Sequence, residues 1–171
     1  MSPSSPRPGG LVWLWLSLVV IALDQATKAL VRAVLEPYVP HPVIAGFFNW
    51  TLAFNTGAAF SFLADQEGWQ RWLFTALAVV VSGILGAWLK RTPRADWRTA
   101  LPLALVIGGA LGNLIDRLTA GHVTDFIQVY FRDWVFPSFN VADSSISVGA
   151  ALLVWFGLFS SGNSAARTPK R

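Results

Sequence analysis

Four long apolar stretches divide the chain. They run over residues 11–34, 72–89, 99–116 and 141–159, close to or above the roughly 20 apolar residues that a helix needs to cross a bilayer. The stretch at 72–89 holds no charged residue, whereas the first stretch contains Asp24 and Lys28. The pattern predicts four transmembrane helices, and therefore an all-α membrane bundle.

Two segments between these stretches have a different pattern. Residues Ile44–Phe54 and Phe126–Phe131 are rich in aromatic and β-branched side chains and are bounded by proline or turn-forming residues. This composition is typical of short strands. Aromatic residues at helical spacing in Ala58–Trp72 predict a short amphipathic helix on the membrane surface.

The first apolar stretch also resembles a secretory signal sequence, because Arg7 precedes the apolar run Leu11–Leu23. No small-residue cleavage site follows the run, so we expect an uncleaved first span. The predicted organisation is then a disordered segment at 1–10, one membrane domain at 11–160 and a basic tail at 161–171.

Composition supports a membrane protein. Hydrophobic residues make up 54% of the 171 residues and charged residues 13%, with a mean hydropathy of +0.51. Soluble domains carry about 25% charged residues, so a soluble enzyme is excluded. The absence of cysteine excludes disulfides and thiolate zinc sites. The pI of about 10.1 does not indicate nucleic-acid binding, because the basic residues cluster at the ends of the apolar stretches.

The basic residues also predict an orientation. Both ends of the chain and the segment at 90–98 hold eight lysines and arginines against one acid, Asp96. The segments at about 35–71 and 116–141, with their flanking helix ends, hold the other five basic residues and eight acids. The positive-inside rule places both termini in the cytoplasm and these two segments outside.

Ionisable residues inside the spans are candidates for function, because one charge at the bilayer centre costs about 2.5–3.5 kcal/mol. Asp24 and Lys28 are four residues apart on one helix face. Asn113, Asp116 and Arg117 share a face at the end of the third span. Two interpretations stay open for both groups: polar contacts that hold the bundle together, or contacts with a substrate.

Asp125 and Asp143 lie at the predicted outer boundary of the membrane. Taken alone, Asp125 is an ordinary loop acid and Asp143, three residues after Asn140, is a helix-capping or first-turn acid. Two carboxylates in one place can instead share a proton, so that one activates water while the other protonates the substrate. That pair predicts peptide hydrolysis without a metal or cofactor.

Other hydrolytic chemistries fit less well. The two histidines, His41 and His122, lie in different segments, and no HExxH motif is present. A zinc site and a histidine-based triad are therefore not expected. A serine–lysine dyad through Lys28 stays open, although no serine has an obvious position beside it.

Five short motifs occur in an order that resembles the bacterial lipoprotein signal peptidase (signal peptidase II) family. They are Asp24–Lys28, Phe54–Phe60, Gly112–Arg117, Val123–Ile127 and Phe139–Ser144. Each motif alone is weak, but the five in order are specific, and the resemblance covers residues 11–160. It implies a small outer β-cradle and a surface helix beside the four spans.

The resemblance implies an aspartic endopeptidase of the bacterial cytoplasmic membrane, with its active site at the outer face. Its substrate would be a diacylglyceryl-modified prolipoprotein, cut on the N-terminal side of the lipidated cysteine. The implied partners are this substrate and membrane lipids, with no nucleic acid, and a monomer is expected.

By position, the resemblance makes Asp125 and Asp143 the catalytic dyad. The implied binding or supporting residues are Asp24, Lys28, Asn55, Gly57, Asn113, Asp116, Arg117 and Asn140. Because Asp143 lies near a helix N-terminus, we hypothesise that it is the ionised base and that Asp125 holds the shared proton.

The competing class is a small proton-coupled membrane transporter or assembly factor, which would also use intramembrane acids. The acids gather on one side of the membrane instead of lining a path across it, which argues against transport. Another type of intramembrane aspartic protease would place its aspartates deeper in the spans.

Overall fold

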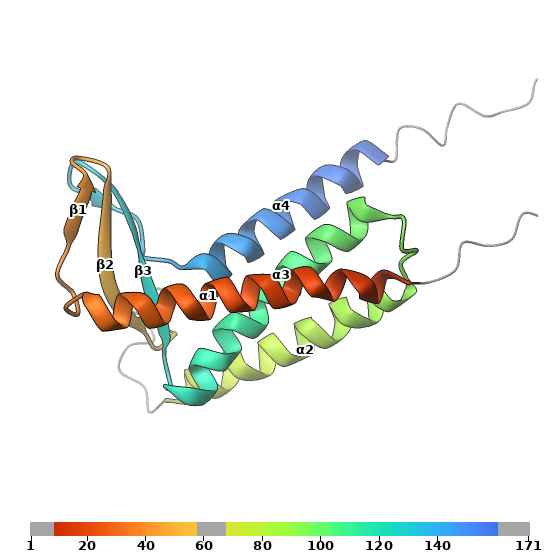
Figure 1. The fold of residues 1–171 in the computed structure, drawn as a ribbon, viewed down its shortest axis with the longest axis horizontal. Coiled ribbons are helices and arrows are strands. Elements are labelled where there is room, and N and C mark those ends of the chain that lie inside the picture. The colour runs from red at the N-terminus through yellow and green to blue at the C-terminus, as the bar shows by residue number, and fades with distance from the viewer. Residues whose placement is uncertain (1–8, 58–67, 161–171) are drawn as a thin grey trace, which may run out of the picture.

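The computed structural model describes residues 9–57 and 68–160. Four helices in this part are long and apolar enough to cross a membrane. The elements are a 3-10 helix, η1 (Gly10–Trp13), the helices α1 (Leu14–Val34), α2 (Trp69–Arg91), α3 (Trp97–Thr119) and α4 (Val141–Ser160), and the strands β1 (His41–Ile44), β2 (Phe48–Asn55), β3 (Val123–Phe131) and β4 (Trp134–Val135). Figure 1 shows the helices running alongside one another, with the sheet at one end.

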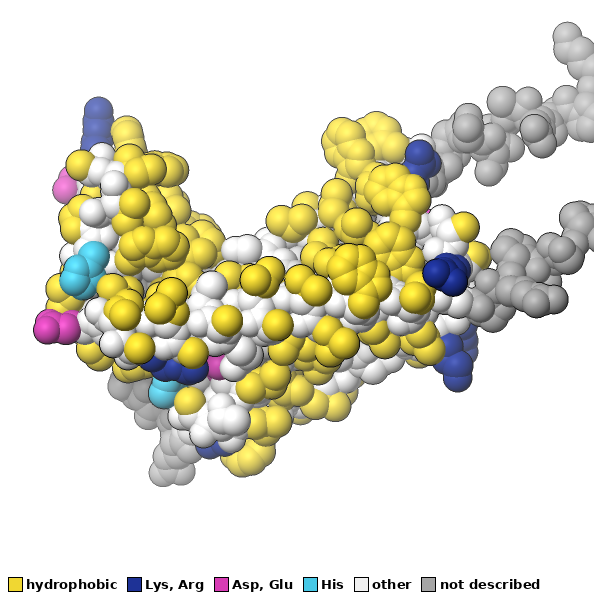
Figure 2. All heavy atoms as spheres, viewed as in Figure 1, with side chains coloured by type: hydrophobic (Ala, Val, Ile, Leu, Met, Phe, Trp, Pro, Cys, Tyr) yellow, Lys and Arg dark blue, Asp and Glu magenta, His cyan; other side chains and the backbone are white. Residues whose placement is uncertain are grey.

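Helix α3 is the centre of the bundle and packs against each of the other three helices. In its most apolar stretch 67% of the residues are buried, compared with 22%, 11% and 17% in the other spans. The outer helices instead expose large side chains such as Leu18, Val80 and Leu158. Figure 2 shows this hydrophobic surface. Lipid contact is the natural environment for such a surface.

Glycines allow the close packing around α3. A Cβ atom added at Gly108 would lie 2.9 Å from Cβ of Val20 in α1. A Cβ at Gly112 would lie 2.8 Å from Oδ2 of Asp24. A larger residue at Gly108 would displace α1, and one at Gly112 would displace the carboxylate of Asp24. The small residues of α3 therefore bring α1 close enough for side chains of the two helices to share a polar cluster.

The helices begin and end somewhat differently from the prediction. The second helix starts at Trp69, not Trp72, and the third covers Trp97–Thr119 instead of 99–116. The ordered chain also starts before residue 11, because the amide of Gly10 donates to the carbonyl of Thr92 at 3.0 Å. Most of the expected surface helix falls on 58–67, outside the described residues.

The strands form one antiparallel sheet in the order β1-β2-β3-β4. The segment Ile44–Phe54, in which the sequence indicated a short strand, holds most of β2 and the last residue of β1. A turn at residues 45–47 separates β1 from β2, and Gly46 adopts the left-handed φ of 79°. Asp125 was expected in a loop, but it lies within β3, opposite Ala53 of β2.

A small apolar cluster holds the sheet against the end of the bundle. Val31 of α1, Leu52 of β2 and Phe126 of β3 are buried together. Because Asp125 and Phe126 are neighbours on one strand, their side chains point to opposite faces of the sheet. Burial of Phe126 against α1 therefore turns Asp125 towards the start of α4.

Candidate active site

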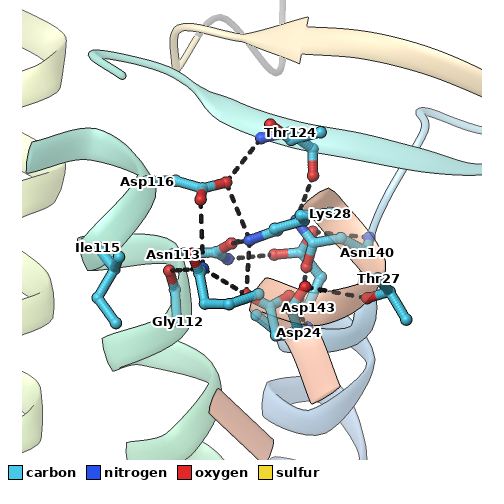
Figure 3. Close-up of polar contacts among 12 residues, drawn as sticks. Asp24, Thr27, Lys28, Gly112, Asn113, Ile115, Asp116, Thr124, Asn140 and Asp143 are labelled. Carbon is cyan, nitrogen blue, oxygen red and sulfur yellow. Dashed lines mark hydrogen bonds and ion pairs between the residues drawn. The ribbon is translucent and has the colours of Figure 1, made fainter. Parts of the chain in front are cut away.

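A fully buried ion cluster joins α1 to α3. The ammonium of Lys28 lies 2.8 Å from Oδ2 of Asp24, one turn earlier on α1, and 3.1 Å from Oδ2 of Asp116 on α3. The three side chains are 0%, 0% and 1% exposed. The ion pair that the Asp24–Lys28 spacing allows is present inside the protein, and Figure 3 shows how the three side chains converge.

Gln25 and two backbone amides complete this cluster. The Gln25 amide donates to Asp24 at 3.1 Å and to Asp116 at 3.2 Å. The backbone N–H of Thr124 in β3 donates to Asp116 at 2.9 Å, and that of Ala142 in α4 donates to Asp24 at 3.0 Å. The two carboxylates therefore fix β3 and α4 relative to α1 and α3.

Sequence reasoning did not single out Gln25 or Thr124. Both stand inside motifs that carry the family resemblance, Asp24–Lys28 and Val123–Ile127. Membership of those motifs was the available signal. Their contacts join residues that are distant in the chain, so no helical or strand spacing reveals them.

Asn113 connects the ion cluster to Asp143. Its Oδ1 accepts a hydrogen bond from Lys28 Nζ at 2.9 Å. Its Nδ2 donates to Oδ1 of Asp143 at 2.7 Å. Asn113 lies one helical turn before Asp116 on the same face of α3, so both reach Lys28.

Asn140 and Asp143 begin α4 with a reciprocal cap. The N–H of Asp143 donates to Oδ1 of Asn140 at 2.9 Å, and the N–H of Asn140 donates to Oδ2 of Asp143 at 3.2 Å. This arrangement satisfies two otherwise unpaired backbone donors. Asp143 is thus the first-turn acid that the sequence indicated, and the cap also holds its carboxylate in place.

Asp125 is 2% exposed and receives two amide hydrogen bonds. Nδ2 of Asn140 donates to its Oδ1 at 2.7 Å, and Nδ2 of Asn55 donates to its Oδ2 at 3.1 Å. Asn55 is held by the N–H of Gly57 at 2.9 Å, in a turn where Gly57 has a φ of 104°. One asparagine, Asn140, therefore contacts both candidate catalytic carboxylates.

Burial raises the pKa of Asp125 from 3.8 to about 7, and the negative charge of Asp143 adds to that effect. The hydrogen bonds from Asn55 and Asn140 and the charge of Lys28 oppose it. A carboxyl with this pKa carries a proton through most of the range below neutrality. Asp125 therefore has the electrostatic setting of a proton donor.

Arg117 faces a different direction from its neighbour Asp116. Its guanidinium lies over the ring of Phe74 in α2 at 5.2 Å from the ring centroid, and it donates to the carbonyl of Asn113 at 3.4 Å. Among the described residues no carboxylate lies within ion-pair distance of Arg117. Its donors are thus available to a ligand.

Two cavities meet at Asp143. One, of about 250 Å³, lies between α2, α3 and α4 and is lined by Asn113, Arg117 and Asp143 together with apolar side chains. The other, of about 550 Å³, includes Asn55, Phe139 and Asp143 and lies in the hollow between the sheet and α4 in Figure 2. A smaller cavity of about 240 Å³ reaches Asp125.

The structure thus places the predicted site residues in two connected groups. Asp24, Lys28 and Asp116 form the ion cluster, whereas Asn55, Asn113, Asn140 and Gly57 surround the carboxylates of Asp125 and Asp143. Arg117 stands at the side, in the cavity between the helices. No group of three histidine, cysteine or acidic side chains suited to a metal occurs in residues 9–57 and 68–160.

Comparison with known proteins identifies close relatives. A family model described as signal peptidase (SPase) II matches residues 16–159. A lipoprotein signal peptidase of Xanthomonas campestris pv. campestris (strain 8004) is 61% identical over 154 residues, covering 90% of this chain and 92% of that protein. A lipoprotein signal peptidase of Xylella fastidiosa (strain M12) is 57% identical over 163 residues, covering 95% and 97%.

Two solved structures share the fold. One is described as a bacterial membrane enzyme structure by the in meso method at 2.3 Å resolution and aligns with a TM-score of 0.80 and 27% identity, covering 96% of this chain and 98% of that one. The second, described in the same words at 1.9 Å resolution, aligns with a TM-score of 0.77 and 26% identity, covering 93% and 97%.

Proposed function

The chain belongs to the signal peptidase II family of membrane aspartic peptidases, and on this premise we propose that Asp125 and Asp143 are the dyad with which it removes signal peptides from prolipoproteins. The observation that carries the proposal is the hydrogen-bonded link through Asn140, which contacts both carboxylates. The alternative of a proton-coupled transporter or assembly factor is not favoured by relatives that are peptidases.

The proposed reaction begins with Asp143 ionised and Asp125 protonated. Asp143 takes a proton from water as the water oxygen attacks the scissile carbonyl carbon, and Asp125 gives its proton to the carbonyl oxygen. The resulting diol collapses when the proton on Asp143 moves to the leaving nitrogen and Asp125 recovers its proton. The products are the carboxylate of the signal peptide and the free amine of the lipoprotein.

The surrounding polar groups suit a substrate that arrives in the membrane. A peptide bond must leave helical structure before it can be cut, and its backbone groups then need new partners. Arg117 and the free hydrogen-bonding positions of Asn55 and Asn113 supply such partners beside Asp143. In this proposal Asn140, which is fully buried, acts on the carboxylates and not on the substrate.

The cavities suggest how a lipid-modified substrate lies in the site. The cavity between α2, α3 and α4 is largely apolar and opens where those helices would face lipid. The larger cavity beside the sheet contains Ser144 and Ser147 and is more polar. We assign the apolar cavity to the membrane-embedded part of the substrate and the cavity beside the sheet to its extended segment. The scissile bond then lies next to Asp143, where the two cavities meet. The bond cut is the one before a diacylglyceryl-modified cysteine.

The proposed location is the bacterial cytoplasmic membrane, with the site at the outer face. Lys90 and Arg91 end α2, at the opposite end of the bundle from the sheet (Figure 1). Under the positive-inside rule a basic end is cytoplasmic, which supports an outer location for the sheet and the proposed dyad. The polar network closes within one chain, which supports a monomer.

The decisive experiment measures cleavage of a diacylglyceryl-modified prolipoprotein peptide in detergent. We expect the wild type to cut before the lipidated cysteine, as mapped by mass spectrometry, and to leave the unmodified peptide intact. Asp125→Asn and Asp143→Asn should each abolish cleavage while remaining folded. Asp133→Asn, an exposed acid between β3 and β4, is the matched control and should cleave normally. Near-normal activity in either dyad variant would overturn the assignment.

A further inference from the structure

Each asparagine around the dyad faces one atom that can only donate a hydrogen bond. For Asn113 this atom is Nζ of Lys28, at 2.9 Å. For Asn140 it is the backbone nitrogen of Asp143, and for Asn55 the backbone nitrogen of Gly57. A donor of this kind requires the oxygen of the amide to face it. The amino group must then point the opposite way.

For Asn113 the opposite direction leads to Asp143. With its oxygen towards Lys28, Asn113 presents Nδ2 to Oδ1 of Asp143 at 2.7 Å. If the amide rotated by 180°, its oxygen would face a carboxylate oxygen, and two acceptors repel each other unless a proton lies between them. Such a proton would have to reside on Asp143, which could then no longer accept one from water.

We propose that Lys28 is a positioning residue for catalysis, which sets the orientation of the Asn113 amide and thereby keeps Asp143 ready to act as the base. The inference rests on the proposed function, since it assigns to Lys28 a role in that same reaction. It adds to the structural role of Lys28 in joining α1 to α3.

The geometry at Lys28 leaves no spare donor. Its three N–H groups meet three acceptors: Asp24 at 2.8 Å, Asn113 at 2.9 Å and Asp116 at 3.1 Å. Arginine carries its donors in a planar fork and does not reproduce this pyramidal set. A lysine that only joined two helices would need Asp24 and Asp116, but not Asn113.

Charged groups from each neighbouring element face this pair. Asp24 comes from α1, Asp116 from α3, Asp125 from β3 and Asp143 from α4, whereas Arg117 of α3 reaches this pair only at the backbone carbonyl of Asn113. A variant that removes Lys28 must therefore preserve the local charge, or it will shift the titration of the dyad for an unrelated reason. The double variant Asp24→Asn/Lys28→Met removes one negative and one positive charge together and leaves the net charge of the cluster unchanged.

The experiment compares this double variant with Asp24→Asn alone, which keeps the contact between Lys28 and Asn113. We expect the double variant to lose roughly 10- to 100-fold in kcat, as when the outer partner of a catalytic group is removed. Its KM should change little, and the acid limb of its kcat profile should move to higher pH. Asp24→Asn removes one negative charge near the dyad but keeps the contact between Lys28 and Asn113, so its acid limb should move the other way, to lower pH.

Ser17→Ala is the matched structural control, because Ser17 is a buried residue of α1 that donates to the carbonyl of Ala104 in α3 at 2.7 Å. It should weaken the same helix pair without changing kcat or the pH profile. If all three variants lose activity only in proportion to the loss of folded protein, with an unchanged pH profile, the positioning role is wrong.

A second readout does not depend on cleavage. In protein labelled with ¹⁵N-asparagine, the Asn113 side-chain amide should exchange its protons slowly in the wild type and in Asp24→Asn, and much faster in the double variant. Equal exchange in all three proteins overturns the inference even if the peptide is not cleaved. Absence of cleavage by the wild type, with the expected exchange pattern, would instead overturn the proposed function.

Discussion

Two pairs of aspartates lie within one hydrogen-bonded network, but they differ in the groups that they contact. Asp24 and Asp116 share the ammonium of Lys28. Asp125 and Asp143 both accept from Asn140, Asp125 from its side-chain Nδ2 and Asp143 from its backbone N–H, and among the described residues neither has a cation within ion-pair distance. The ammonium of Lys28 offsets the repulsion between the two carboxylates of the first pair. The second pair has no such cation, and the negative charge of Asp143 helps to raise the pKa of Asp125, which favours one proton divided between the two.

The comparison shows how a protein can use the same residue type for support and for chemistry. The first pair is expected to contribute to stability and little to proton transfer. The second is expected to contribute to proton transfer and little to stability. Three substitutions and one pH profile test this division.

The largest expected effect on stability is that of Asp116→Asn. The change removes one ion-pair partner of a fully buried lysine and turns an amide group towards another donor, Gln25. We expect a loss of about 3 kcal/mol in the free energy of unfolding, the lower end for breaking a buried ion pair, because Asp24 still faces Lys28. Thermal or denaturant unfolding in detergent measures it.

The control for Asp116→Asn lies on the same helix. Asp96 caps the start of α3 by accepting from the N–H of Thr99, and asparagine caps a helix equally well. Asp96→Asn should therefore leave stability unchanged. Equal losses of stability in the two variants would show that the buried ion cluster contributes no more to stability than the helix cap does.

Gly112→Ala should cost about 1–3 kcal/mol, the usual range for overpacking. Its new Cβ atom would lie 2.8 Å from Oδ2 of Asp24 and would push the ion cluster apart. Gly83→Ala, on α2, is the matched control because nothing lies within 4 Å of its added Cβ. That change should stabilise the protein slightly by favouring the helix. A harmless Gly112→Ala would show that α1 and α3 tolerate a wider separation.

The pH dependence of cleavage tests the dyad directly. Because the pKa of Asp125 is raised to about 7, this carboxyl keeps its proton below that pH and loses it above. The proposed reaction needs the proton, so kcat/KM should fall by roughly tenfold for each pH unit above about 7. Initial rates from pH 5 to about 9 measure the limb, and unfolding at each pH shows that the protein stays folded. A kcat/KM that stays constant up to pH 9 would show that Asp125 is not the proton donor.

The smallest effect is expected for Arg32→Gln. Arg32 is partly exposed and lies 3.9 Å from Oδ1 of Asp116, so solvent screens most of this interaction. Stability should fall by less than about 1 kcal/mol, with an unchanged pH profile. A larger loss would show that the ion cluster depends on an outer cation as well as on Lys28.

The helices were predictable because lipid imposes a simple pattern. A span must be long and apolar, and the ionic spacing of Asp24 and Lys28 follows from one helical turn. The site was harder to predict from spacing. Lys28 and Asn113 are 85 residues apart, so their contact appears only when α1 and α3 pack together. Family motifs pointed to the residues, but not to which of them touch.

The sheet shows why the local sequence pattern does not predict the strands correctly near the site. The turn at Gly46 lies within an otherwise apolar and aromatic run, so the pattern of Ile44–Phe54 did not show where β1 ends and β2 begins. Likewise β3 begins at Val123 and includes Thr124 and Asp125, whose polar side chains are buried. These polar residues are buried because they belong to the site. The strand therefore lacks the alternation of apolar and polar residues that is usual when one face of a strand meets water.

The reciprocal cap between Asn140 and Asp143 has a consequence for the timing of synthesis. Asp143 belongs to the last of the four spanning helices, and its carboxylate is held only when α4 begins at its proper residue and meets Asn113 of α3. A partly synthesised chain therefore lacks one carboxylate of the proposed dyad, however well its first three helices are inserted. Because α4 is synthesised after the other three helices, the proposed site is completed, and proteolysis becomes possible, only when all four helices have assembled in the bilayer.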